Sequence, residues 1–208
     1  MEKSLSHYLL PNNTTDLLSW NDLFAISNII SQHNPNLLGY AQQAPNNPTT
    51  TQHSLSKNHT YRMSTLNDYT PSFLKQRIES YYDTLHITDY KQQKEKENAD
   101  IDCIFYFSFF PNAESHGIHY DASPIYHWQH LGQAQWTVYE NDTPYTYILN
   151  PGDCLFIPEK VYHDVLPLTA RLGLTFSFFP NDYHNYHDAL DNPSNFTAED
   201  YYMRKNKS

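Results

Sequence analysis

Two stretches in the first half of the chain carry apolar residues at helical spacing. The first follows Ser19, a favourable N-cap residue, and Asp22 lies where an acidic side chain can complete a capping box. Its apolar residues recur with helical periodicity: Trp20, Leu23, Phe24, Ile26, Ile29 and Ile30. We predict a helix over residues 20–31 that stops before His33-Asn34-Pro35, because the residue before a proline disfavours helical geometry.

The second helical stretch spans residues 71–84, and Pro71 suits its first turn. Its apolar stripe consists of Phe73, Leu74, Ile78, Tyr81, Leu85 and Ile87. Residues 41–60 are rich in Pro, Asn, Thr and Gln, and residues 91–100 have no apolar anchor, so both are predicted loops. The longer loop is either a lid or substrate-binding arm beside a site, or an insertion without such a role.

After residue 100 the pattern changes to short apolar or alternating runs, which are separated by turn signals such as the segment at 150–153. The predicted strands lie at 101–110, 117–121, 124–131, 134–141, 144–149, 154–158, 162–167 and 171–179. No helical pattern interrupts them. Short strands in such succession are typical of a double-sheet barrel or jelly roll, so the predicted fold is mainly β with N-terminal helices.

The length suits one domain with a sizeable core. We expect a single domain over residues 1–208 of the 24.4 kDa chain. Its parts are a helical and loop region at 1–98, a barrel at 100–180 and a polar tail at 181–208, with a short helix near 197–204.

Composition narrows the function classes. The formal net charge of -10 argues against a broad electrostatic contact with nucleic acid or an anionic membrane surface. No window approaches a membrane span, and the first residues hold no apolar stretch of signal-peptide length, so we expect a cytoplasmic protein. Cys103 and Cys154 each lie in an apolar run and are interpreted as buried free thiols.

The residues with the clearest chemical potential are His119, Asp121 and His163. Residues two apart on a strand point to the same side, so His119 and Asp121 can aim at one point that His163 reaches from another strand. Two histidines and one carboxylate on one face, with further positions open, suit non-haem Fe(II) oxygen chemistry. The alternative is that these side chains only pack and hydrogen-bond. Three further histidines nearby are interpreted as supporting or surface residues: His116, His127 and His130.

A basic residue, Arg171, opens the last predicted strand, and Lys160 is the only other Lys or Arg between residues 100 and 180. In this strand, four polar or small residues alternate with apolar ones: Arg171, Gly173, Thr175 and Ser177. A guanidinium can hold a carboxylate through two parallel hydrogen bonds. We favour a position for Arg171 in a polar cavity, and the alternative is an exposed sheet edge.

Residues from about Leu66 to Pro180 resemble the Jumonji-type (JmjC), cupin-like hydroxylases, a group that includes ribosomal oxygenases and asparaginyl hydroxylases. The resemblance rests on His119-Tyr120-Asp121, Gln129, Gly132, Trp136, Pro151-Gly152-Asp153 and the segment from Ile157 to His163. It implies a double-stranded β-helix with Fe(II) held by His119, Asp121 and His163. It also implies O2 and 2-oxoglutarate as cosubstrates, and hydroxylation coupled to decarboxylation of the 2-oxo acid.

The sequence departs from this family at one position. Family members usually place a Lys or Arg two residues after the glycine to bind the cosubstrate, and here that position is Ala134. Either Arg171 takes over this role, with Thr175 or Tyr106 as hydroxyl partners, or 2-oxoglutarate is not used.

Three function hypotheses follow. The first is an Fe(II)- and 2-oxoglutarate-dependent dioxygenase that hydroxylates a protein side chain or a small metabolite, without a nucleic-acid or membrane partner. The second is a cupin-type metalloenzyme that does not use 2-oxoglutarate. The third is a non-catalytic metal- or ligand-binding cupin, because one barrel fold hosts many functions.

Overall fold

The computed structural model describes residues 7–10, 16–33, 38–40, 59–63, 72–84, 92, 99–121, 123–141 and 143–180. Two helices are seen there, α1 (Trp20–His33) and α3 (Ser72–Thr84). The strands are β1 (Tyr8–Leu10), β2 (Leu38–Tyr40), β3 (Tyr61–Met63), β4 (Ala99–Ser108), β5 (Ile125–Leu131), β6 (Ala134–Glu140), β7 (Thr143–Leu149), β8 (Cys154–Ile157), β9 (Tyr162–Pro167) and β10 (Arg171–Pro180).

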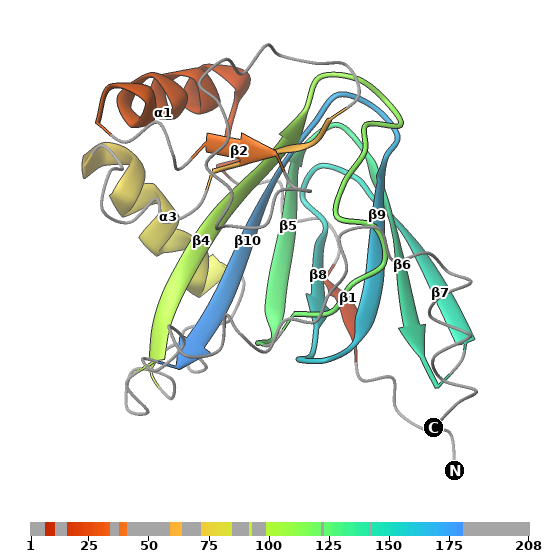
Figure 1. Cartoon of the computed structure of the whole chain (residues 1–208). Coiled ribbons are helices and arrows are strands. Elements are labelled where there is room, and N and C mark those ends of the chain that lie inside the picture. Colours follow the sequence, from red (N-terminus) through yellow and green to blue (C-terminus); the bar gives the residue numbers. More distant parts are fainter. Residues whose placement is uncertain are drawn as a thin grey trace.

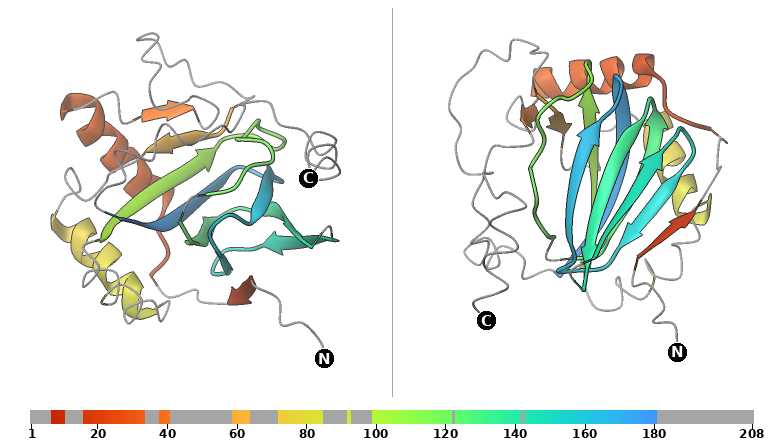
Figure 2. Two further views of the ribbon diagram at one scale, coloured as in Figure 1. Left: turned by 60° about the horizontal axis from the view of Figure 1, so that its bottom comes forward. Right: turned by 90° about the vertical axis from the view of Figure 1, so that its right-hand side faces the viewer.

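The strands form two antiparallel sheets. The larger has seven strands in the order β1-β8-β5-β10-β4-β3-β2, and the smaller has three in the order β7-β6-β9. The smaller sheet faces the larger one, and α1 and α3 lie on the opposite side of the larger sheet (Figures 1 and 2). This arrangement confirms the predicted double-sheet architecture. No described helix is long and apolar enough to cross a membrane.

Most predicted elements occur within one or two residues of their expected bounds. The main exception is residues 117–121, where only His119 is paired, through an isolated bridge. Gly117 has a positive φ of 72°, which interrupts an extended strand just before the bridge. The sequence pattern also missed β1, β2 and β3. Residues 41–58 and the tail helix proposed near 197–204 lie outside the described residues.

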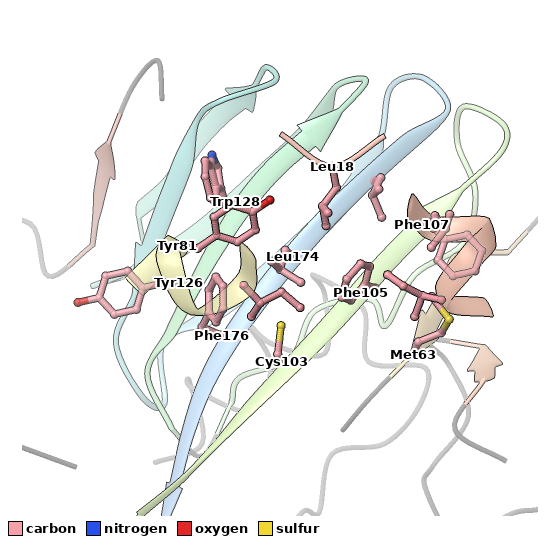
Figure 3. Close-up of a cluster of buried hydrophobic side chains, with 14 of the residues drawn as sticks. Leu18, Met63, Tyr81, Cys103, Phe105, Phe107, Tyr126, Trp128, Leu174 and Phe176 are labelled. Atoms are coloured by element: carbon pink, nitrogen blue, oxygen red, sulfur yellow. The ribbon is translucent and has the colours of Figure 1, made fainter. Parts of the chain in front are cut away.

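The larger hydrophobic core lies between the helices and the outer face of the seven-stranded sheet (Figure 3). Leu172, Leu174 and Phe176 of β10 are buried there, because every second side chain of a strand points to the same face. The apolar stripes of α1 and α3 pack into the same core, where Leu23 and Tyr81 are buried. Cys103 and Cys154 are buried free thiols in this cluster, as predicted.

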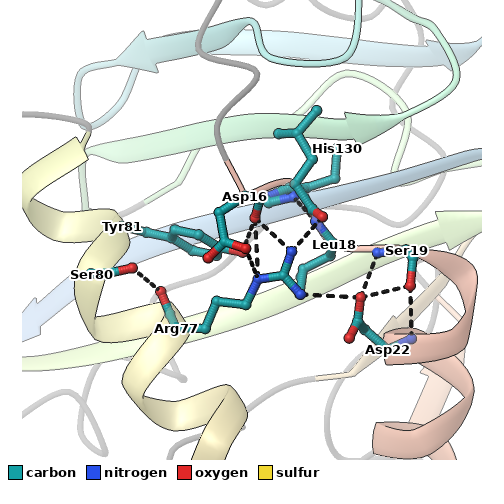
Figure 4. A network of polar contacts seen from close by, with 9 residues as sticks. Asp16, Leu18, Ser19, Asp22, Arg77, Ser80, Tyr81 and His130 are labelled. Atoms are coloured by element: carbon teal, nitrogen blue, oxygen red, sulfur yellow. Dashed lines mark hydrogen bonds and ion pairs between the residues drawn. The ribbon is translucent and has the colours of Figure 1, made fainter.

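A network of polar contacts joins the helices to the sheet (Figure 4). Arg77 on α3 donates to the carbonyl of Asp16 at 2.8 Å and pairs with the carboxylate of Asp22 on α1 at 3.2 Å. The backbone N–H of Leu18 donates to Nδ1 of His130 on β5 at 2.8 Å. The segment before α1 is thereby fixed against both α3 and the sheet, and His130 has a structural role.

A second hydrophobic cluster joins the two sheets. The inner face of the large sheet contributes Ile125, Leu155 and Ile157. The facing side of the small sheet contributes Ala134, Trp136, Val138, Leu149 and Val165. The inner face is therefore apolar at the β5–β8 side. Along β10 it is polar, since Arg171, Thr175 and Ser177 are buried on the side opposite to the outer core.

Candidate metal centre

His119 and His163 are brought together by a single antiparallel bridge. The backbone N–H of each residue donates to the carbonyl of the other, at 3.0 Å from His119 and 2.7 Å from His163. Residues paired directly across a ladder project to the same side. The two imidazole centroids accordingly lie 4.4 Å apart. The structure thus places both histidines side by side although they are far apart in the sequence.

Asp121 completes the cluster. Its Oδ2 lies 3.4 Å from Nε2 of His163, and one ligand atom from each of His119, Asp121 and His163 lies within 4.8 Å of the other two. Ligand bonds of about 2.1 Å place neighbouring donor atoms of one metal roughly 3 Å apart. Small side-chain adjustments would therefore enclose an ion. The Asp121 side chain is 37% exposed and that of His163 only 2%, so one side of the cluster is open to solvent.

Backbone carbonyls orient both imidazoles. Nδ1 of His119 lies 2.8 Å from the carbonyl of Gly117, and Nδ1 of His163 lies 3.0 Å from the carbonyl of Val161. Because a carbonyl only accepts hydrogen bonds, each Nδ1 carries the proton and each Nε2 keeps its lone pair for a metal. Burial lowers the pKa of His163 to about 4, with a further lowering from His119, so this imidazole is neutral at neutral pH, as a metal ligand must be.

Aromatic rings surround the ligands. Trp136 on β6 is buried and stacks beside His163 with a centroid distance of 5.6 Å and an interplanar angle of 27°. The same indole lies 4.5 Å from the ring of His127 on β5. His116 lies 4.9 Å from the ring of His119. Trp136 thus shields His163 from water, and His116 is the supporting histidine that contacts a ligand directly.

Arg171 lies at the start of β10 and is only 1% exposed. Within the described part of the chain, its Nε and Nη1 atoms have no hydrogen-bond partner. Burial lowers the pKa of this guanidinium to about 10, so it stays charged at neutral pH. A buried charge with unused donors is unfavourable unless an anion completes it. The exposed-edge alternative for Arg171 is therefore wrong.

The other two predicted cosubstrate residues lie on the same face as Arg171. Tyr106 of β4 is directly opposite Gly173 of β10, and Gly173 and Thr175 follow Arg171 at every second position. Side chains that oppose each other across a sheet share a face. Tyr106 also acts on Arg171 electrostatically, in the direction that raises its pKa against the effect of burial. Whether Tyr106 and Thr175 contact a cosubstrate stays a prediction.

A buried polar chain that the sequence pattern did not indicate runs along this face. The Oγ1 of Thr175 lies 2.7 Å from Nδ1 of His127, and Nε2 of His127 lies 3.4 Å from Oε1 of Gln129. The Gln129 amide donates to the carbonyl of Leu131 at 2.6 Å. His127 fits because Gly173 has no side chain: a Cβ there would lie 2.4 Å from the imidazole. Only the pairing register of β5 and β10 reveals this contact.

Ala134 stands at the position where members of the JmjC family usually have a Lys or Arg. It is fully buried in the cluster between the sheets and is paired with Leu149 and Pro167. Arg171 nevertheless begins its strand close by, because the preceding carbonyl of Ala170 packs against Gly132, where a Cβ would lie 1.9 Å from that oxygen. The start of β10 therefore lies near the turn that precedes Ala134, although β10 and β6 belong to different sheets.

Comparison with solved structures finds YcfD, a ribosomal oxygenase from Escherichia coli. Its complex with cobalt and 2-oxoglutarate matches with a TM-score of 0.57 and 16% sequence identity, over 97% of this chain and 61% of that chain. Its complex with cobalt and succinic acid matches with a TM-score of 0.54 and 17% identity, over 93% of this chain and 55% of that chain. No protein-family model and no curated protein matches the sequence. The chain thus spans less than two thirds of YcfD and shares its fold, which confirms the barrel class that the JmjC resemblance implied.

Proposed function

We propose that this protein is an Fe(II)- and 2-oxoglutarate-dependent oxygenase that hydroxylates a protein side chain or a small metabolite. The observation that carries the proposal is the convergence of His119, Asp121 and His163 within 4.8 Å. Two imidazoles and one carboxylate with open positions are the donor set of non-haem Fe(II) oxygenases. The shared fold with YcfD, whose structure is described as a complex with cobalt and 2-oxoglutarate, supports the same assignment.

Different residues would bind the metal, orient its ligands and exclude water. His119, Asp121 and His163 would hold the iron, and the carbonyls of Gly117 and Val161 keep both imidazoles in the tautomer that binds metal. When bound, the metal and the 2-oxo acid supply the oxidising chemistry of the reaction. Trp136 excludes water from the buried side of the ligands, because it is itself buried against His163.

Arg171 would bind the distal carboxylate of 2-oxoglutarate. Its charge is buried, its Nε and Nη1 donors are unused within the described residues, and it lies on the face of the large sheet that is turned toward the small one. A guanidinium fork and a carboxylate form two parallel hydrogen bonds. Thr175 or Tyr106 would add a hydroxyl contact from the same face.

One observation favours a second candidate, a cupin-type metalloenzyme that does not use 2-oxoglutarate. Ala134 leaves the family's usual anchor position without a cation, and its surroundings are apolar. The two candidates agree on the metal ligands and differ only in whether Arg171 receives the cosubstrate.

An anaerobic titration separates these candidates. Fe(II) is added to the purified protein with and without 2-oxoglutarate, and visible absorption is recorded for wild type, Arg171→Ala and His163→Ala. We expect a charge-transfer band that needs both components, is weakened by Arg171→Ala and is absent in His163→Ala, because the latter removes one of three donors. Circular dichroism verifies that the variants are folded, and Asp164→Asn, beside the ligand but outside the ligand set, should behave as wild type.

Each contrary outcome has a definite meaning. Iron binding that does not respond to 2-oxoglutarate would reject the oxygenase proposal in favour of the second candidate. Stoichiometric iron in folded His163→Ala would refute the ligand assignment. A band unchanged in Arg171→Ala would show that the cosubstrate is held elsewhere.

A further inference from the structure

Arg62, in the middle of β3, projects to the same face of the large sheet as Arg171. Arg62 lies opposite Tyr106 of β4, and Tyr106 lies opposite Gly173 of β10. Side chains directly opposite each other point to the same side of a sheet, so Arg62 shares a face with Tyr106 and with every second residue of β10. The two neighbours of Arg62 in the chain are fully buried in the outer core, which fixes this orientation.

Arg62 lies near the ligand cluster. It is directly opposite Tyr106 across the sheet, and the Tyr106 ring lies 6.0 Å from that of His116. The His116 ring in turn lies 4.9 Å from that of His119. The ion pairs seen in the described ranges involve other side chains, so neither Arg62 nor Arg171 is neutralised by a described carboxylate.

The charges of the ligand cluster and of the two arginines do not balance with metal and cosubstrate alone. Asp121 is the single carboxylate of the ligand cluster, and it offsets half of the charge of a divalent ion. The two charges of 2-oxoglutarate offset the rest of the ion and one guanidinium. Among these groups one positive charge remains, in a protein whose formal net charge is -10. A local positive site of this kind attracts an anion. Arg171 is buried and Arg62 is only partly buried, so Arg62 is the arginine that a larger substrate can reach.

We propose that Arg62 is a substrate-binding residue and that the primary substrate presents a carboxylate to it. This inference rests on the proposed oxygenase function and specifies the substrate class. The carboxylate comes either from an acidic side chain of a peptide or from a small organic acid. Both use the same chemistry, a charge-assisted pair between a guanidinium fork and a carboxylate.

Calorimetric titrations under anaerobic conditions test the inference. Protein loaded with Co(II) and saturated with 2-oxoglutarate is titrated with the capped tripeptide acetyl-Gly-Asp-Gly-amide, with its Asn counterpart, with its Lys counterpart, and with malate. The proteins are wild type, Arg62→Gln, Arg62→Lys and Lys160→Gln, the last being an exposed basic residue with its side chain 72% accessible. A separate titration measures the affinity of each protein for 2-oxoglutarate.

We expect wild type to bind the acids and not their Asn or Lys counterparts. Arg62→Gln should lose about tenfold or more in affinity for the acids, as expected for a lost charge-assisted hydrogen bond, and keep its affinity for 2-oxoglutarate. Arg62→Lys should recover part of the loss, and Lys160→Gln should match wild type. The better of the two acids, tripeptide or malate, identifies the source of the carboxylate.

Two outcomes would overturn the inference, and a third would separate it from the proposed function. Equal binding of the Asp and Asn tripeptides, or preference for the Lys tripeptide, would show that no carboxylate is recognised. Loss of 2-oxoglutarate affinity in Arg62→Gln would make Arg62 a cosubstrate anchor. Acid binding that depends on Arg62 in a protein that never binds 2-oxoglutarate would instead sustain the anion site while refuting the oxygenase proposal.

Discussion

At the scale of single residues, the ligand cluster depends on contacts made by the backbone. Carbonyls of Gly117 and Val161 select the tautomers of His119 and His163, and the reciprocal hydrogen bonds of the bridge hold the two histidines in register. These partners are main-chain groups, so no side chain is needed for them. The position of the ligands is therefore set by chain geometry.

Gly173 gives a residue-scale prediction. In Gly173→Ala the new Cβ would lie 2.4 Å from the ring of His127, so the imidazole must move away from Thr175. We expect a loss of about 1–3 kcal/mol in the free energy of unfolding, as for other overpacked sites. Urea denaturation measures the loss, with Ser177→Ala on the same face as the control. Wild-type stability in Gly173→Ala would show that His127 does not depend on this space.

At the scale of elements, α1 is fixed at its start. Ser19 and Asp22 form the predicted capping box: the N–H of Ser19 donates to the Asp22 carboxylate at 2.6 Å, and the N–H of Asp22 donates to the Ser19 hydroxyl at 3.3 Å. The same carboxylate accepts from Arg77 on α3 at 3.2 Å. One side chain thus caps α1 and links the two helices that cover the outer core.

This link makes helix docking sensitive to acid. Burial by itself raises the pKa of Asp22, but the hydrogen bonds from Ser19 and the charge of Arg77 outweigh it and hold this pKa below its ordinary value of 3.8. A lowered folded-state pKa contributes stability above pH 3.8, and this contribution is lost as the pH falls through the folded-state pKa.

The corresponding prediction compares Asp22→Asn with wild type. At pH 7 the variant should be less stable by about 1 kcal/mol, because the cap survives but the ion pair does not. The difference should shrink as the pH is lowered below about 4. Chemical denaturation at a series of pH values measures it, and Glu79→Gln on the exposed side of α3 should follow wild type. A difference that is constant over the whole pH range would contradict the assignment.

At the scale of the whole molecule, the proposed ligands join two sheets. His163 belongs to β9 of the three-stranded sheet, and His119 is bridged to it, whereas Arg171 belongs to β10 of the seven-stranded sheet. A metal held by His119, Asp121 and His163 alone would not contact the seven-stranded sheet. A 2-oxo acid bound to both metal and Arg171 would connect the layers.

Thermal unfolding tests this connection. A ligand at 100 times its Kd stabilises the folded state by about 2.7 kcal/mol, and 1 kcal/mol shifts the Tm of a chain of this size by about 2–4 °C. We expect Co(II) with 2-oxoglutarate to raise the Tm by more than the sum of the two separate effects. Arg171→Ala should keep the shift from Co(II) alone and lose the excess. Additive shifts in wild type would argue against a ligand that joins the sheets.

The sequence was sufficient to predict both described helices, most strands and the three candidate ligands. Helical and alternating periodicities report directly which side chains a local element can bury, and the Ser19–Asp22 capping box is complete within four residues. The motif His119-Tyr120-Asp121 could be recognised in the same way, since the residue types alone show which donor atoms it offers. The strands β1, β2 and β3 were missed because three residues carry too little periodic signal.

The way in which these pieces meet could be seen only in the folded molecule. Three features depend on the register between strands that are distant in the sequence. These are the contact of His119 with His163, the packing of His127 against Gly173, and the common face of Arg62 and Arg171. Register follows from packing of the whole sheet against its two cores, because a shift by one residue would turn every side chain to the opposite face. The local sequence therefore determines which functional side chains each strand has, and the packing of the whole molecule determines which of them lie in one site.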